Sequence, residues 1–149
     1  MNLEEKLGYF FFDKRVLKRS LTRPAYALEQ QQQGQNCEHQ EAYGVLGDAV
    51  LKTVLTELLI RAGYTTQPDL NARKAELESQ ANLARISEAI GVSYVLKLSN
   101  AEKQQRAYEQ PAVLAAGLQA VIGGIYLDGG FRAARECIER LFRESFLVE

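Results

Sequence analysis

Between residues 38 and 62, apolar side chains recur at steps of three and four, and this pattern limits the possible folds more than any other feature of the chain. The side chains that follow it are Ala42, Val45, Leu46, Ala49, Val50, Val54, Leu55, Leu58 and Leu59. A helix with about 3.6 residues per turn gathers such positions into one broad apolar stripe. Gly63 is a suitable residue to end that helix. The sequence therefore predicts a long helix over residues 38–62, buried along a broad stripe.

The segment before this helix contains signals for two short helices and a loop. Asn2 and Glu5 have the spacing of a capping box, and Asp13 can cap a second helix. Pro24 is expected to begin a loop that continues into a glutamine-rich run at about residues 29–36. Because that polar run has nothing to bury, it predicts a flexible surface loop.

More helical signals follow Gly63. Asp69 is expected to cap a helix that runs to about residue 90, with Gly91 in the stop position. Residues 94–98 fit either a strand or a helix, and residues 99–108 fit either a short helix or a loop. The residue pattern leaves both alternatives open for these two segments.

The C-terminal part predicts a helix that begins at Pro111, breaks at residues 128–130 and is followed by a last helix over residues 131–146. Three glycines lie inside the first of these helices: Gly117, Gly123 and Gly124. Each costs ~1 kcal/mol relative to Ala, so their presence suggests that another helix crosses very close by. With 46% hydrophobic residues, the chain has enough apolar surface for a packed core. We expect a single all-α domain over residues 1–149.

Composition excludes several classes of protein. The net charge is -1, which argues against a protein that grips nucleic acid through bulk positive charge. The N-terminus lacks the positive region of a secretory signal, and the apolar run at residues 7–12 is far shorter than the ~20 residues of a membrane span. Cys37 and Cys137 do not form a disulfide framework. We expect a cytoplasmic protein without a membrane partner; an organellar location stays open if the chain is a processed form.

Two motifs resemble those of a known family. Residues 40–51 read QEAYGVLGDAVL and resemble the ribonuclease III signature, whose usual form is NERLEFLGDAVL. Residues 114–130 read LAAGLQAVIGGIYLDGG and are similar to the second motif of the family, typically ADxFEAxIGAIYLDGG. The opening LGYFFFD at residues 7–13 is similar as well. The resemblance covers nearly the whole chain and implies the helical nuclease domain of the family, without the double-stranded-RNA-binding domain of its larger members.

The resemblance also implies a chemistry. Ribonuclease III enzymes hydrolyse double-stranded RNA with divalent metal ions, usually Mg²⁺, held by clustered carboxylates. Paired metal ions neutralise charge on the attacking and leaving oxygens, and hard Mg²⁺ favours oxygen ligands. Positions 41, 44 and 48 share one helical face, and positions 116 and 119 share another. Crossing these two faces would gather five acidic positions of the family.

In this chain the acids themselves are incomplete. Glu41 and Asp48 match the family, whereas Gly44, Ala116 and Gln119 are neutral where the family has acids. The catalytic set is therefore not intact, and the two remaining carboxylates can hold at most one weakly bound Mg²⁺. Asp48 is then expected to hydrogen-bond a facing helix, and the amide of Gln119 can join a polar network in place of a metal cluster. We expect a domain that has lost nuclease activity and requires no cofactor.

The alternative is an active metal-dependent endoribonuclease that cleaves double-stranded RNA through a divergent site. In that case Mg²⁺ or Mn²⁺ would be bound by Glu41 and Asp48, with help from residues elsewhere such as Glu38 or Glu109. Cleavage that depends on Asp48 would favour this alternative.

A basic stripe gives the candidate RNA-binding residues. Its members are Lys14, Arg15, Lys18, Arg19 and Arg23, most of them four residues apart. Such a stripe fits either phosphate contacts or a solvated helix face, and both interpretations stay open. Arg23 also stands where the family commonly has a histidine, while the single histidine, His39, lies in a polar stretch and is expected to be exposed.

The expected partners follow from the resemblance. Family members pair two nuclease domains about a twofold axis, so a homodimer is expected, and pairing with an active ribonuclease III-type paralogue is a second possibility. Structured or double-stranded RNA is the expected nucleic-acid partner. The expected role is that of a non-catalytic RNA-associated protein, or of an assembly protein in a ribonucleoprotein.

Overall fold

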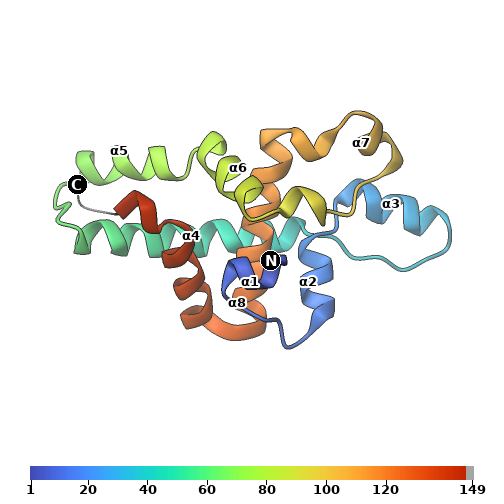
Figure 1. Cartoon of the computed structure of the whole chain (residues 1–149), viewed down its shortest axis with the longest axis horizontal. Helices are drawn as coiled ribbons and strands as arrows, with labels where there is room; N and C mark the ends of the chain where they lie inside the picture. Colours follow the sequence, from blue (N-terminus) through green and yellow to red (C-terminus); the bar gives the residue numbers. More distant parts are fainter. Residues whose placement is uncertain (147–149) are drawn as a thin grey trace.

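The computed structural model describes residues 1–146, and these residues form helices joined by short connections (Figure 1). The α-helices are α1 (Leu3–Leu7), α2 (Lys14–Ser20), α3 (Pro24–Gln32), α4 (Glu41–Arg61), α5 (Gln67–Leu77), α6 (Gln80–Ala89), α7 (Asn100–Gln104) and α8 (Pro111–Leu141). Three short 3-10 helices span Val92–Tyr94, Ala107–Glu109 and Arg143–Phe146. Within residues 1–146 there is no strand, only an isolated bridge between Thr22 and Lys97. The predicted all-α fold is confirmed.

The two longest helices, α4 and α8, cross steeply at the centre of the molecule (Figure 1). At the crossing their backbones touch, because Gly47 and Gly123 have no side chains to separate them. A Cβ atom added to Gly47 would lie 1.7 Å from the carbonyl oxygen of Gln119. One added to Gly123 would lie 2.0 Å from the carbonyl oxygen of Tyr43. The close helix contact that the glycines of α8 predicted is therefore present, and it involves the backbones of both helices.

The hydrophobic core surrounds this crossing. From α4, the side chains of Leu51 and Leu55 are fully buried, and from α8 those of Leu118 and Ile122 are fully buried. The predicted apolar stripe of the long helix at residues 38–62 is only partly buried: Val50, Val54, Leu55 and Leu59 lie in the core, whereas Ala42, Val45 and Ala49 are exposed. The buried part packs on α8 and α5.

Helix α8 is long and apolar enough to cross a membrane, judged by length and composition alone. However, 61% of its most apolar window is buried inside the domain. Gly130 also interrupts the helix with φ 88° and ψ 177°, a conformation that favours glycine. The predicted break at residues 128–130 is therefore a kink at Gly130, and α8 is a bent core helix.

Just before this kink, Asp128 holds the segment that joins α1 to α2. Its carboxylate accepts hydrogen bonds from the hydroxyl of Tyr9 at 2.6 Å and from the backbone N–H groups of Phe12 at 2.7 Å and Asp13 at 3.0 Å. Desolvation alone would raise the pKa of Asp128, but these three hydrogen bonds outweigh it and the pKa is lowered. Burial and the same carboxylate raise the pKa of Tyr9. Asp128 thus fastens the N-terminal segment to α8.

Asn2 and Asp13 cap their helices as predicted, although among residues 1–146 only the Asn2 half of the predicted capping box with Glu5 is present, and the segment after Pro24 is not a loop. The side chains of Asn2 and Asp13 accept hydrogen bonds from the first turns of α1 and α2. Pro24 occupies the first turn of α3, where its fixed φ and missing N–H suit a helix. Residues 29–32 of the predicted glutamine-rich loop are consequently helical, and the loop itself begins at Gln33.

The predicted single helix from Asp69 to about residue 90 is two helices. Thr66, not Asp69, caps α5, because its hydroxyl accepts a hydrogen bond from the Asp69 N–H. Ser79 caps α6 by accepting a hydrogen bond from the Asn82 N–H at 3.2 Å. The Asn82 side chain donates to the carbonyl of Leu77 at 2.8 Å. These local side-chain hydrogen bonds compete with a continuous helix and divide it.

Alanine substitutions at Gly47 and Gly44, both in α4, are expected to change stability differently, because only Gly47 lies at the helix crossing. We expect Gly47→Ala to destabilise the domain by about 3 kcal/mol or more, because the added methyl group would force the two backbones apart. A Cβ at Gly44 meets nothing within 4 Å, so Gly44→Ala is expected to stabilise by up to ~1 kcal/mol through helix propensity. Urea unfolding followed by circular dichroism measures both. Equal effects of the two substitutions would contradict the backbone contact.

The lowered pKa of Asp128 predicts a pH dependence. The stability it contributes is present above its unfolded pKa of about 3.9 and is lost as pH falls through its lower folded pKa. Asp128→Asn should therefore reduce the free energy of unfolding by about 1–3 kcal/mol at pH 7, and the difference should shrink below about pH 4. Urea unfolding between pH 7 and 2.5 measures this, with Asp69→Asn on exposed α5 as control. A pH-independent difference would contradict the assignment.

Candidate functional site

Beside the helix crossing lies a cavity of about 560 Å³. Its walls come from the start of α3, the first turns of α4 and the first half of α8. The lining residues are Arg23, Pro24, Gln40, Glu41, Gly44, Val45, Asp48, Ala116 and Gln119. All five positions at which the family that the sequence resembles has acids thus line one cavity. They lie on α4 and α8, the two helices on which residue spacing predicted them.

Two of these residues meet directly across the crossing. The side-chain amide of Gln119 donates a hydrogen bond to Oδ1 of Asp48 at 3.2 Å. Asp48 directly follows Gly47, and Gln119 is the residue whose carbonyl Gly47 approaches, so the backbone contact sets this distance. The polar contact that sequence alone suggested between Asp48 and the facing helix is present.

Lys52 also contacts Asp48 and connects it to Glu78, and the sequence analysis identifies neither residue. The ammonium group of Lys52, one turn further along α4, lies 2.8 Å from Oδ1 of Asp48. It also lies 3.6 Å from Oε2 of Glu78, at the C-terminal end of α5. The hydrogen bond to Asp48 raises the pKa of Lys52. Asp48 and Lys52 are four residues apart on a helix, which is a signal for their pairing; no local signal connects Glu78 to them.

Arg23 stands at the edge of the cavity and joins three elements. Its Nε donates to Oε2 of Glu102 at 3.0 Å, and one of its terminal nitrogens donates to Oε1 of Gln40 at 3.3 Å. Gln40 is buried and its amide donates to the carbonyl of Ser20 at 2.8 Å. Arg23 therefore connects α7 to the start of α4 and is part of the scaffold around the cavity.

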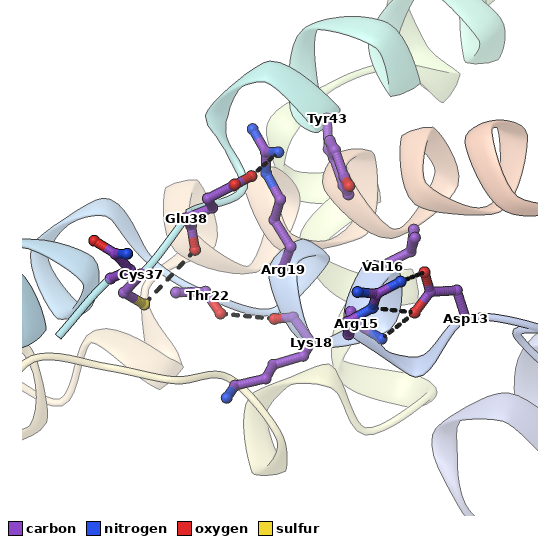
Figure 2. A pocket seen from close by; sticks show the side chains of 10 residues that line it. Asp13, Arg15, Val16, Lys18, Arg19, Thr22, Cys37, Glu38 and Tyr43 are labelled. Carbon is purple, nitrogen blue, oxygen red and sulfur yellow. Dashed lines mark hydrogen bonds and ion pairs between the residues drawn. The ribbon is translucent and has the colours of Figure 1, made fainter.

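Arg15, Lys18 and Arg19 border a second cavity, of about 440 Å³, which Lys14 does not line (Figure 2). Arg15 pairs with Asp13 at 3.0 Å, and Lys14 pairs with Glu4 at 2.6 Å. Arg19 pairs with Glu38 and donates to the carbonyl of His39 at 2.9 Å. The stripe thus has many of its charges neutralised by carboxylates of the same chain.

Arg19 makes a further contact at this cavity, and Lys18 differs from the paired residues. The guanidinium of Arg19 lies over the ring of Tyr43, 4.6 Å from its centroid, in a cation–π contact. Lys18 has no carboxylate within ion-pair distance among residues 1–146, and its side chain extends away from the paired residues (Figure 2). His39 is half-buried rather than exposed, and its Nδ1 accepts a hydrogen bond from the Glu41 N–H at 3.3 Å.

The comparisons with known proteins now decide the family. Residues 13–145 match the family described as Ribonuclease-III-like. The chain belongs to the ribonuclease III family. The motifs at residues 40–51 and 114–130, on which the resemblance was based, are therefore correctly identified.

Relatives and solved structures agree with this assignment. The chain is 35% identical over 140 residues to Ribonuclease 3 of Desulfotalea psychrophila, covering 93% of this chain and 57% of that protein. It is 36% identical over 144 residues to Ribonuclease 3 of Heliobacterium modesticaldum, covering 96% of this chain and 60% of that protein. The chain thus spans somewhat more than half the length of these curated relatives.

The solved structure of the nuclease domain of ribonuclease III from Campylobacter jejuni has the same fold. It superposes with a TM-score of 0.87 at 30% identity, covering 98% of this chain and 97% of that one. That nuclease domain contains a region involved in dimer formation, which is flexible in the structure.

The ribonuclease III family is normally Mg²⁺-dependent, but the donor set here does not fit a two-metal cluster. Glu41 and Asp48 are seven residues apart on α4, so their backbones are separated by two turns, or roughly 10 Å. Gly44 lies in the turn between them and offers no ligand. Among residues 1–146, no three His, Cys, Asp or Glu side chains lie close enough together to hold a metal ion. Oδ1 of Asp48 already accepts from Lys52 and Gln119.

The position of Arg23 generates a prediction about the scaffold of this ribonuclease III-like site. Its side chain is 22% exposed and that of Glu102 is 14% exposed, so removing the guanidinium leaves a largely desolvated carboxylate and an unpaired Gln40 oxygen. We expect Arg23→Met to reduce the free energy of unfolding by about 1–3 kcal/mol.

The matched control is Arg132→Met. Arg132 is 91% exposed and pairs with Glu136 one turn away, so its loss should change stability by less than about 0.5 kcal/mol. Urea unfolding at pH 7 measures both variants. If the two substitutions cost the same, Arg23 does not have the structural role assigned to it.

Proposed function

We propose that this chain is a catalytically inactive ribonuclease III-like domain that acts as a dimeric RNA-associated protein, in RNA processing or ribonucleoprotein assembly. The observation that supports it most directly is the chemistry of the 560 Å³ cavity. Gly44, Ala116 and Gln119 supply no carboxylate, and Asp48 is engaged by an amide and an ammonium group. A site that holds no metal pair lacks several kcal/mol of transition-state stabilisation, which is roughly a thousandfold or more in rate.

Dimerisation is supported by an exposed apolar side chain at the cavity. Val45 on α4 is 72% exposed and lines the cavity between Gly44 and the neighbouring turn. A large apolar side chain in such a position fits burial against a partner, and a twofold axis would bring the same surface of a second copy to it. The dimer-forming region of the Campylobacter nuclease domain is consistent with this. The partner is a second copy of the chain or an active ribonuclease III-type paralogue.

RNA association is proposed through the basic stripe. Lys18 supplies the least neutralised charge, and Arg15 and Arg19 lie on the same cavity. Phosphates of structured or double-stranded RNA can exchange with the carboxylates that now pair these arginines, at an affinity that falls with salt. The two free cysteines, Cys37 and Cys137, fit a reducing intracellular compartment, where we propose that the protein acts.

An active metal-dependent endoribonuclease is the second candidate. It is favoured by the curated relatives, which are named Ribonuclease 3, and by the retained Glu41 and Asp48. In this case Mg²⁺ or Mn²⁺ would be needed, and residues outside the cavity would have to complete the site.

Incubation of the purified protein with long double-stranded RNA separates the two candidates. We expect the protein to retain the RNA in a mobility-shift assay. In about 10 mM Mg²⁺ or Mn²⁺ the RNA should stay intact, with a cleavage rate roughly a thousandfold or more below that of an active ribonuclease III measured in parallel. Cleavage that disappears in Asp48→Ala would overturn the proposal. Absence of RNA retention even at low salt would overturn the binding part of the proposal, and a strictly monomeric sedimentation profile at micromolar concentration would overturn its dimer part.

A further inference from the structure

Lys52 reaches carboxylates from two different helices, which an ordinary surface ion pair on one helix does not do. Its ammonium group lies 2.8 Å from Asp48 on its own helix and 3.6 Å from Glu78 at the end of α5. Asp48 also accepts from Gln119 on α8. Four side chains from α4, α5 and α8 therefore converge on one small polar cluster, which we call the Lys52 cluster: Asp48, Lys52, Glu78 and Gln119.

Glu78 shows why this cluster needs a cation. Its side chain is only 15% exposed, and its Oε1 is buried without a hydrogen-bond partner among residues 1–146. A carboxylate with little access to water is costly unless an opposite charge lies close by. In the described part of the chain, Lys52 is the cation within ion-pair distance of Glu78, so it offsets negative charge that water reaches poorly.

The Lys52 ammonium group contacts a position at which the ribonuclease III family has an acid. Asp48 is the retained acid of α4, and Gln119 is a neutral amide where the family has an acid on α8. Lys52 binds the same Asp48 oxygen that faces Gln119. A cation is therefore already held at the α4–α8 crossing, and it belongs to the protein.

We propose that the Lys52 ammonium group takes the place of a divalent metal ion at Asp48, so that the domain neutralises this carboxylate internally and excludes metal from it. This inference rests on the proposed function, because it supplies a reason why the retained Asp48 does not bind metal. A divalent ion would have to displace the ammonium group from both carboxylates and exchange several of its own waters, which Mg²⁺ does reluctantly. A lysine that is a covalent part of α4 also acts at all metal concentrations.

Metal uptake without RNA tests the inference. Mn²⁺ is titrated into wild-type protein, Lys52→Met and the control Lys103→Met, an exposed lysine on α7, and free Mn²⁺ is followed by electron paramagnetic resonance. We expect wild type and Lys103→Met to show no saturable uptake up to about 1 mM. Lys52→Met is expected to take up one Mn²⁺ with a dissociation constant at least tenfold below that concentration, because the substitution leaves Asp48 and Glu78 without their cation.

The double variant Lys52→Met/Asp48→Asn places the bound ion. It is expected to lose the gained Mn²⁺ uptake, since the carboxylate of Asp48 is gone. Thermal unfolding gives a second readout: Lys52→Met should melt about 2–6 °C below wild type without metal and regain most of that shift in Mg²⁺ or Mn²⁺, whereas wild type and Lys103→Met should be insensitive to both ions.

Two results would overturn the inference. One is saturable Mn²⁺ uptake by wild type that Asp48→Asn removes. The other is a folded Lys52→Met variant, checked by circular dichroism, that gains neither Mn²⁺ uptake nor a metal-dependent melting temperature. Failure of the proposed function is measured separately, by RNA retention and cleavage. A protein that does not bind RNA can still show the expected metal titration. A protein that retains intact RNA can still bind Mn²⁺ at Asp48, which would contradict only the further inference.

Discussion

The backbone contact between Gly47 and Gly123 is the constraint on which the rest of the structure depends. It brings α4 and α8 closer together than side chains at these positions would allow. It therefore fixes how the neighbouring residues of the two helices are placed relative to each other. Asp48 and Gln119 meet at 3.2 Å because each lies next to that contact, not because either is held by a loop. Fully buried core residues around the crossing, such as Leu51 and Ile122, hold it in place. Site geometry and core packing are consequently the same feature.

This arrangement explains how the scaffold of a ribonuclease III domain persists without its full set of acids. The motif residues retained in this chain are those with structural tasks: Gly47 and Gly123 at the crossing, and Asp128 with Gly130 at the bend of α8. Asp128 fastens the segment of Tyr9 through three hydrogen bonds that have no role at the cavity. Substitutions at Gly44 and Ala116 leave all of these contacts untouched, so the fold and the chemistry can change independently.

Sequence reasoning succeeded where structure is local or periodic and failed where it depends on distant contacts. The apolar period predicted α4, and the spacing of positions 41, 44 and 48 predicted their common face. The glutamine-rich segment was assigned to a loop because its composition is polar, yet Pro24 in the first turn and the buried Ala27 give its first part a helical alternative. Lys52 was detectable from its four-residue spacing to Asp48. Glu78 was not, because it reaches the site only through the packing of α5 on α4.

The charge balance at the crossing connects these points. A glutamate at position 119 would place a second carboxylate about 3 Å from Asp48, and two like charges that close need a cation between them to stay ionised. With Gln119 at this position, a hydrogen bond to Asp48 stands in place of that repulsion. Lys52 places a cation beside the remaining carboxylate, that of Asp48. The neutral residue on α8 thus lowers the number of carboxylates at the crossing, and the lysine on α4 places a cation of the chain itself beside Asp48. The amide and the ammonium group hold Asp48 by contacts within the chain, which fits the proposed role in binding rather than in cleavage.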